Sequence, residues 1–422
     1  MSSPATLSER RATLVTDATI GEHAGPLDGL KVVERAEGVS GPYCGKLLAD
    51  LGAEIVKIEA PGTGDPARRM APFFHDAPGP DSGLLFNSLN TNKLGVSLDL
   101  PTPLGKELLS RLLEAADVFL FGGEAREIET QGIQYETLSQ TKPRLVGVYV
   151  TPFGLSGPKR DWRGSELVAF QGSGLGFATP GEKNNPKCLP PLKAGGHQAL
   201  MTAGLTAAAA TMHAIFALET AGPGQRVDVS EVEPLASFQF MELARWTYAG
   251  DPGKRGVREF GQRIRCKDGE VSIMFMQDYM WKAWVDVMGN PDWARRTEFE
   301  TQAGRTEYQR EIAAGIEMWA ADRPKEEIYR LGQSRRVPVF PLNSVADAVD
   351  SAQVQSRSFL RDLPLACGAT AVGPTAPYRF SRTPWTIRRA APRLGEHNRE
   401  IFCGRLGLPP DVLVAAYAAG HM

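Results

Sequence analysis

The chain has 422 residues and a formal net charge of −2, from 47 Lys and Arg residues against 49 Asp and Glu residues. This balance leaves no basic excess for binding nucleic acid or an anionic membrane surface. With 42% hydrophobic and 23% charged residues, the composition excludes disordered and collagen-like chains. It is typical of a globular protein with one large and one smaller domain.

The cysteines argue against a disulfide framework or a metal site. They are odd in number, widely spaced and form no C-x-x-C pair: Cys44, Cys188, Cys266, Cys367 and Cys403. Residues 1–26 have no continuous apolar core of the kind that a secretory signal needs, so they are predicted to be a polar extension. The sequence therefore predicts a cytoplasmic protein without a metal ion.

In chain order, a strand at 30–34, a helix from Gly41-Pro42 to Gly52 and a strand at 54–59 predict a parallel α/β unit. The pattern continues with predicted strands at 94–98, 117–120 and 145–150 and a helix at 103–115. The first half of the chain is thus predicted to form a doubly wound, Rossmann-like domain.

The segment 199–218 is uncharged and long enough to span a membrane, but Ala and Thr dominate it and transfer poorly into lipid. A buried helix of a soluble core is the better interpretation. Further elements are expected at 226–230 (strand), 231–249 (helix) and 265–273 (hairpin). The expected domains are an extension at 1–26, a large domain at 27–235, a smaller α+β domain with linkers at 236–345, and a segment at 346–422 that completes the large domain.

Most motifs with a known chemistry are missing. Gly62-Thr63-Gly64 follows a strand, but Ala67 stands where the third glycine of a dinucleotide-binding loop would fall. The chain has no P-loop, no H-E-x-x-H, no G-x-S-x-G and no Cys/His cluster. Zinc chemistry and a serine triad therefore have no candidate residues.

Two residues are candidates for a site, each with two open interpretations. His197 lies in a Gly-Gly-His turn before the Ala-rich helix, either facing a cleft or hydrogen-bonded as a structural histidine. Glu166, in Gly-Ser-Glu-Leu, is either a carboxyl group with a raised pKa or a carboxylate at a helix start that is bound by amide groups. Periodicity and spacing alone lead to a soluble two-domain α/β protein and no further.

An ordered set of motifs gives the chain a family resemblance from about residue 27 to residue 410. The set is Leu27-Asp28-Gly29-Leu30, Gly41-Pro42, Leu51-Gly52-Ala53-Glu54, Gly64-Asp65-Pro66, Asn92-Lys93, Gly154-Leu155-Ser156-Gly157-Pro158, Gly222-Pro223-Gly224-Gln225 and Leu394-Gly395-Glu396-His397. In this order the motifs resemble the family III CoA-transferases of the CaiB/BaiF type. The resemblance implies an α/β fold with a Rossmann-like large domain and a smaller α+β domain, in an interlocked dimer. It also implies a coenzyme A thioester as substrate and no covalently bound cofactor.

In this family an aspartate attacks the acyl-CoA thioester to form a mixed anhydride. The family places that aspartate shortly after a Pro-Pro pair and four residues before a helix glycine that precedes a G-x-G-Q turn. Pro190-Pro191, Gly204 and Gly222-Pro223-Gly224-Gln225 fit these anchors, and the residue they select is Leu200. An alkyl side chain cannot act as the nucleophile, so the resemblance leaves Glu166 as the fallback catalytic residue.

Other departures from the family pattern concern the CoA site. Phe121-Gly122-Gly123-Glu124-Ala125-Arg126 replaces the usual Glu-Asn-Phe-x-Pro-Gly loop, and Ala60 and Leu94 replace basic residues. Lys93 remains as the expected CoA-binding residue, and His197 as a candidate for the substrate site. Ser165 precedes Glu166, so the His/Asp pair of the related racemases is not reproduced.

The first hypothesis is therefore a non-catalytic subunit of a heteromeric family III CoA-transferase. Its partner would be a homologous subunit that carries the aspartate, and its small-molecule partners an acyl-CoA such as succinyl-CoA and a carboxylic acid. The subunit type that it resembles is the aspartate-lacking subunit of succinyl-CoA:(R)-benzylsuccinate CoA-transferase, of anaerobic toluene degradation. Two alternatives stay open: a homodimeric transferase that uses Glu166, and an acyl-CoA-binding protein without turnover.

Overall fold

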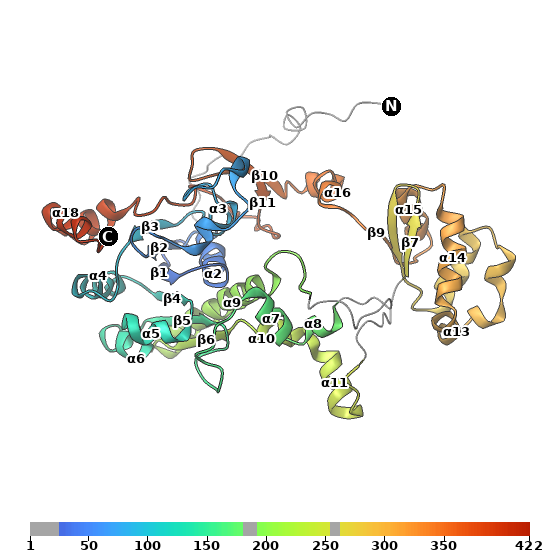
Figure 1. Cartoon of the computed structure of the whole chain (residues 1–422), viewed down its shortest axis with the longest axis horizontal. Helices are drawn as coiled ribbons and strands as arrows, with labels where there is room; N and C mark the ends of the chain where they lie inside the picture. Colours follow the sequence, from blue (N-terminus) through green and yellow to red (C-terminus); the bar gives the residue numbers. More distant parts are fainter. Residues whose placement is uncertain (1–24, 180–191, 254–261) are drawn as a thin grey trace. The chain divides into compact units, whose positions relative to one another are not determined.

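The computed structural model describes residues 25–179, 192–253 and 262–422 (Figure 1). They form two compact units, with residues 25–179, 192–253 and 357–422 in the first and residues 262–356 in the second. The units divide near residues 253 and 357, whereas the sequence-based boundaries lie at 235 and 346. Residues 1–24 of the expected extension lie outside the described part.

The first unit is built on a six-stranded sheet in the order β3-β2-β1-β4-β5-β6. Every neighbouring pair in it is parallel. The strands are β1 (Lys31–Ala36), β2 (Glu54–Glu59), β3 (Leu94–Ser97), β4 (Val118–Gly122), β5 (Val146–Thr151) and β6 (Arg226–Ser230). All six strands are predicted by the sequence, and the doubly wound sheet is confirmed.

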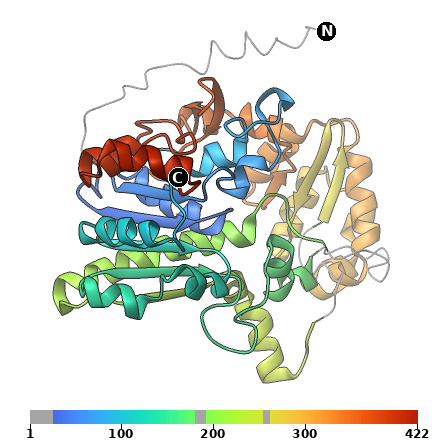
Figure 2. The same cartoon turned by 60° about the vertical axis from the view of Figure 1, so that its left-hand side comes forward.

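Helices cover both faces of this sheet, as a parallel sheet requires. On one face, α2 (Ser40–Ala49) and α9 (Gln198–Ala221) bury an apolar cluster that includes Leu48, Val148 and Ala207. The other face packs against α4 (Pro103–Glu114), α5 (Ala125–Gln131), α6 (Tyr135–Thr141), the π-helix η6 (Arg399–Arg405) and α18 (Pro410–Ala418). Helix α18, drawn in red, lies near the blue strands of the same unit (Figure 2).

Helix α9 packs closely on α2 because Gly204 has no side chain. A Cβ atom at Gly204 would lie 2.4 Å from the carbonyl oxygen of Ser40. Within the described residues, α9 is the one helix long and apolar enough to cross a membrane by length and composition. The predicted core helix is confirmed for one face only, since Leu205 and Phe216 on the other face are 55% and 70% exposed.

The remaining elements of the first unit are short. They are η1 (Pro66–Arg69), η2 (Phe74–Asp76), α3 (Leu84–Leu89), α7 (Glu166–Gly172), α8 (Leu175–Ala178), α10 (Glu233–Ala236), η3 (Ser237–Gln239), α11 (Phe240–Ala249) and the antiparallel pair β10 (Leu360–Pro364) and β11 (Thr370–Pro374). The single helix predicted over 231–249 is therefore divided into α10, η3 and α11.

The second unit combines a three-stranded antiparallel sheet with helices. The predicted hairpin at 265–273 is confirmed as β7 (Gln262–Cys266) and β8 (Gly269–Ile273), and β9 (Val339–Pro341) adds a third strand. Its helices are α12 (Asp278–Val287), η4 (Asp292–Arg295), η5 (Thr297–Phe299), α13 (Gln302–Glu307), α14 (Gln309–Ala320), α15 (Lys325–Ser334), α16 (Val345–Val349) and α17 (Ala352–Ser356). Trp281, Trp284 and Phe299 are central to its core.

Candidate active site

The candidate site lies at the carboxyl edge of the six-stranded sheet, where the strand order reverses between β1 and β4. Ligands of parallel α/β sheets bind at such a reversal. Helix α2 begins here, directly beside the end of β4. A Cβ atom on Gly41 would lie 2.6 Å from the Cβ of Ala36 and 3.0 Å from the Cα of Gly122. Glycines at 41 and 122 therefore allow the start of α2 to touch the neighbouring strand.

Glu166 caps the start of α9 from the neighbouring helix α7. Its Oε1 accepts the backbone N–H of Ala199 and its Oε2 accepts that of Leu200, each at 3.1 Å. The residue is only 7% exposed. A carboxylate at a helix start is stabilised by the unpaired N–H groups and by the helix dipole. Of the two interpretations of Glu166, this geometry favours the carboxylate bound by amide groups. The amide groups belong to the start of α9 and not to the start of α7, the helix that contains Glu166.

Leu200 is the third residue of α9, and its backbone N–H is one of the two that Glu166 binds. The side chain is partly exposed. This position sits in the first turn of a long helix, where the dipole would favour a negative charge. The leucine side chain brings no group to this turn that could attack or exchange a proton.

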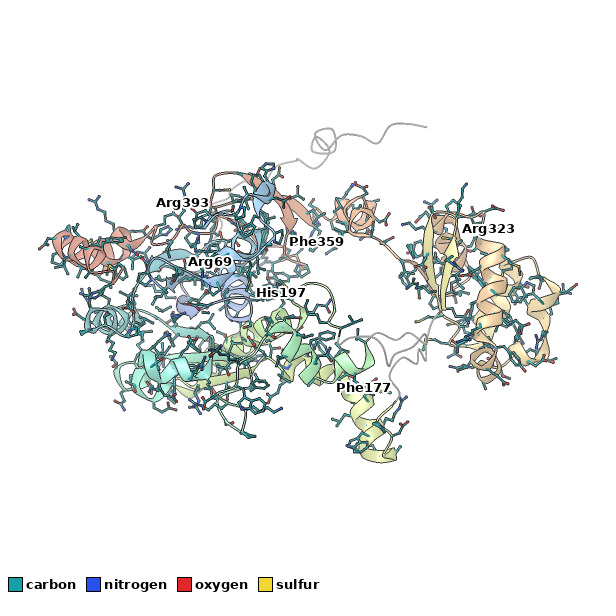
Figure 3. All side chains as sticks on the ribbon, in the orientation of Figure 1. Arg69, Phe177, His197, Arg323, Phe359 and Arg393 are labelled. Carbon is teal, nitrogen blue, oxygen red and sulfur yellow. The ribbon has the colours of Figure 1, made fainter. Side chains whose placement is uncertain are left out.

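His197 is the N-cap residue of α9 and is labelled in Figure 3. Its carbonyl oxygen accepts the first backbone hydrogen bond of the helix, from Met201 at 2.8 Å. Its ring Nδ1 is buried and has no hydrogen-bond partner among the described residues. The structure thus brings His197, Leu200 and Glu166 together around one helix start.

Glu231 is a fourth member of this cluster that the sequence analysis missed. It follows β6 directly, and its Oε1 accepts a hydrogen bond of 2.6 Å from the hydroxyl of Ser40 at the start of α2. Burial raises the pKa of the Glu231 carboxyl to about 7, the Ser40 hydrogen bond lowers it, and the negative charge of Glu166 raises it further. The signal in the sequence was an acidic residue directly after a predicted parallel strand, which places it at the carboxyl edge of the sheet.

The raised pKa of Glu231 makes the stability of the first unit depend on pH. The pKa of Glu231 in the folded protein is about 7, above the usual glutamate value of 4.5. The protonated carboxyl therefore stabilises the folded protein below pH 4.5, and this contribution is lost as the pH rises through 7. A Glu231→Gln variant cannot ionise, so its stability relative to the unchanged protein should rise between pH 5 and pH 8 by on the order of 2–3 kcal/mol. Urea unfolding at the two pH values measures this difference. The exposed neighbour Glu233 provides the control, because Glu233→Gln should change the stability by the same small amount at both pH values. A stability difference between Glu231→Gln and the unchanged protein that does not vary with pH would contradict the prediction.

Lys93 lies inside the first unit, at 0% exposure. Its three ammonium hydrogens are directed to Glu34 at 2.9 Å, to the carbonyl oxygen of Pro42 at 2.9 Å and to Asn90 at 3.0 Å. Burial lowers the pKa of Lys93 to about 8, partly opposed by the charge of Glu34. The ammonium group has no hydrogen left to donate to a ligand, so this placement does not support the predicted contact with CoA. It gives Lys93 a structural role at the start of α2.

The turn that resembles part of a dinucleotide loop anchors the same buried ion network. Asp65 pairs with Lys57 at 2.9 Å and accepts the backbone N–H groups of Gly38 and Ala67 at 2.9 Å and 2.8 Å. Burial alone would raise the pKa of Asp65, but Lys57 and these N–H groups outweigh burial and lower it. Gly62 and Gly64 thus belong to a structural turn in this chain.

The sequence and fold comparisons identify the family. A sequence model described as CoA-transferase family III matches residues 27–398. The chain belongs to this family.

The chain is 32% identical over 411 residues to the succinyl-CoA:(R)-benzylsuccinate CoA-transferase subunit BbsE of Thauera aromatica, covering 91% of this chain and 97% of that protein. It is 29% identical over 408 residues to the formyl-CoA:oxalate CoA-transferase of Streptomyces avermitilis, covering 92% and 97%. Among solved structures, a CaiB/BaiF family protein from Brucella suis matches with a TM-score of 0.79 and 27% identity, covering 90% of this chain and all of that one.

Membership of the family III CoA-transferases confirms the α/β architecture with a parallel sheet that the resemblance implies. This family uses CoA thioesters as substrates. The loop that replaces the usual CoA-lining segment connects β4 to α5, and its Glu124 forms ion pairs with Arg126 and Arg163. Leu94, at a position where the family often has arginine, is 4% exposed in β3. In place of the polar groups expected to face CoA, the chain thus has a carboxylate paired with two exposed arginines and a buried leucine.

Proposed function

We propose that this chain is the non-catalytic subunit of a heteromeric family III CoA-transferase, interlocked with a homologous subunit that carries the aspartate. The observation that supports this most directly is Leu200 in the first turn of α9. There the sequence anchors place the family's nucleophile, and the helix dipole would assist a carboxylate.

The family reaction needs a carboxylate oxygen at every covalent step. The aspartate attacks the thioester carbonyl, the bond to sulfur breaks and the CoA thiolate leaves, which gives a mixed anhydride. The thiolate then attacks the anhydride at the aspartyl carbonyl and releases the first carboxylic acid. The incoming acid repeats these steps in reverse order with its own carboxylate. Leu200 cannot form the anhydride.

Two carboxyl groups near Leu200 are poorly suited to replace the aspartate. Both oxygens of Glu166 accept backbone N–H groups of α9, so an attack by either would break a charge-assisted bond and uncap the helix. The raised pKa of Glu231, about 7, leaves much of it protonated in neutral solution, and a protonated carboxyl is a weak nucleophile.

An exposed apolar helix supports a partner chain. Five large side chains on α11 are more than half exposed, namely Phe240, Met241, Leu243, Trp246 and Tyr248. Large exposed apolar side chains that gather on one helix are typical of an interface. We assign it to the contact with the catalytic subunit.

The relative in Thauera aromatica guides the choice of substrates. Its name makes it one subunit of an enzyme for succinyl-CoA and (R)-benzylsuccinate. We propose the same pair for the complex of this chain, in a cytoplasmic step of anaerobic toluene degradation.

Intact-protein mass spectrometry tests the proposal. The purified chain is incubated with succinyl-CoA and then with hydroxylamine, which converts an acyl-enzyme into a hydroxamate. We expect no change in the mass of this chain, and an adduct on the homologous subunit when the two are co-expressed. A carboxylate-linked adduct on this chain alone would favour the homodimeric enzyme with Glu166. Binding of acyl-CoA without an adduct on either chain would favour a binding protein without turnover.

A further inference from the structure

The amino-terminal edge of the six-stranded sheet carries a pocket that the proposed reaction does not use. It has a volume of about 210 Å³ and lies between the first residues of β1 and β2, the end of α4 and the π-helix η6. The helix starts of α2 and α9 are at the carboxyl edge of the sheet. The pocket is therefore separate from the candidate active site, at the opposite end of the same strands.

The walls of the pocket are apolar and belong to the core. Val33, Val56, Leu112 and Ile401 line it and are 3%, 7%, 8% and 0% exposed. An engineered apolar cavity of about 150 Å³ is enough to bind benzene. The pocket therefore has room for one aromatic ring and a small substituent.

The mouth of the pocket carries three basic side chains, Lys31, Arg111 and Arg405, together with the carboxylate of Glu54. Asp117 lies beside it and accepts the backbone N–H of Lys31 at 2.9 Å. Arg405 is paired there, with Glu54 at 2.9 Å and with Glu400 at 2.8 Å. Arg111 donates a hydrogen bond to the carbonyl oxygen of Leu406. Among the described residues, the one carboxylate within ion-pair distance of its guanidinium is that of the exposed Glu107, at 3.8 Å.

Lys31 also lines the pocket, and its side chain is exposed. In the described part of the chain no carboxylate lies within ion-pair distance of the Lys31 ammonium. Lys31 and Arg111 thus offer two positive groups beside an apolar chamber. In the described residues Arg111 alone of the two has a carboxylate within ion-pair distance, and that contact with Glu107 is long.

The π-helix is a second, independent indication of a site. In η6 the N–H of Leu406 bonds to the carbonyl oxygen of Ile401, five residues earlier, at 3.0 Å. This wider turn places Ile401 and Arg405 on the wall of the same pocket. π-Helical turns are rare and occur frequently at functional sites.

We propose that this pocket binds a small monocarboxylate with one aromatic ring. The ring lies among Val33, Val56, Leu112 and Ile401, and the carboxylate is bound by Lys31 and Arg111 at the mouth. The apolar walls favour the ring, and the two basic groups favour a carboxylate over a neutral analogue.

The test is a ¹⁹F NMR titration of the full chain with 4-fluorobenzoate, and with 4-fluorobenzyl alcohol as the neutral analogue. A ligand of this size is expected to bind with a Kd on the order of 1 mM. The alcohol should bind more weakly. Lys31→Met should weaken 4-fluorobenzoate binding roughly three- to fivefold, as expected for a partly exposed ion pair. The control is Lys106→Met. Lys106 is an exposed lysine on α4 that does not line the pocket, so its replacement should leave the affinity for 4-fluorobenzoate unchanged.

A variant at the mouth tests the location. Ala115 lines the pocket and is exposed, so Ala115→Trp can fill the mouth and should abolish binding. If Ala115→Trp does not fold, a crystal of the unchanged chain with 4-iodobenzoate gives the location from the anomalous signal of iodine. Equal affinities for the acid and the alcohol, an affinity unchanged by Lys31→Met, or an iodine signal outside the pocket would each overturn the proposal.

Discussion

A Leu200→Asp variant is expected to acquire a covalent adduct from succinyl-CoA that the unchanged chain does not form. The substitution places a carboxylate in the first turn of α9, at the position where the sequence anchors put the family's nucleophile. A carboxylate at this position is favoured by the helix dipole by about 0.3–1 kcal/mol. The nearby Glu166 opposes it by charge repulsion, but its two oxygens stay bonded to Ala199 and Leu200 through backbone N–H groups. Mass spectrometry of the intact variant, before and after hydroxylamine, measures the adduct.

The matched control is Leu200→Asn, which has nearly the same shape and polarity and no carboxylate. It should gain no adduct. Two outcomes would contradict the proposal that the missing nucleophile makes this chain non-catalytic. One is an adduct on the asparagine variant. The other is a folded Leu200→Asp variant that acquires no adduct, either alone or with the partner subunit.

Replacing Glu34 by glutamine should destabilise the first unit strongly, by about 3–5 kcal/mol. Glu34 is 0% exposed and pairs with two lysines that are also 0% exposed, Lys57 at 3.2 Å and Lys93 at 2.8 Å. Lys57 keeps Asp65 and the carbonyl oxygen of Ala36 as partners. Lys93 keeps only neutral partners, so a buried charge is left without a counter-charge.

The loss of stability should depend on pH through Lys93. Its folded-state pKa of about 8 is below the usual lysine value of 10.5, so in the unchanged protein stability rises with pH between 8 and 10.5. Glu34 raises this pKa, and its removal therefore lowers the pKa further and extends the window to lower pH. Urea unfolding should show a larger loss at pH 6 than at pH 9. Glu107→Gln, at a residue that is 63% exposed, should change the stability little at either pH; a loss for Glu34→Gln that is small or independent of pH would contradict this account.

The sheet could be predicted from the sequence because its strands are short apolar runs separated by turns. The segments at 145–150 and 117–120 are almost wholly apolar, as expected of strands covered on both faces. The segment Glu54–Glu59 alternates instead, which is typical of a strand with one exposed face. In the structure its polar face is also buried, and Lys57 and Glu59 are both 0% exposed. Periodicity could not show this, because it detects alternation and not the ion pairs that permit burial.

The candidate site was predictable only in part. The position of Leu200 followed from anchors in the sequence, whereas the role of Glu166 depends on a contact between α7 and α9, 33 residues apart. The sequence predicts a continuous helix from 231 to 249, and this prediction hides the position of Glu231 at the end of β6. The helical stretch changes to a 3-10 turn at η3, where Gln239 leaves the helical region with φ −86° and ψ 26°. The resemblance assigns Lys93 to CoA, whereas in the structure Glu34, Pro42 and Asn90 already bind its ammonium group.

The return of residues 357–422 to the first unit has a consequence for how the protein is made. Ile401, Phe402, Leu408, Leu413, Ala416 and Met422 complete an apolar cluster whose other buried members precede residue 150. Asn92 likewise accepts the backbone N–H groups of Arg388 and Arg389. At a synthesis rate of about 5–20 residues per second, the ribosome needs roughly 10–30 seconds after residue 253 to deliver these last partners. Over that interval the nascent first unit has an uncovered apolar face, while residues 262–356 already hold a complete core of their own, so the middle of the chain can fold before its beginning.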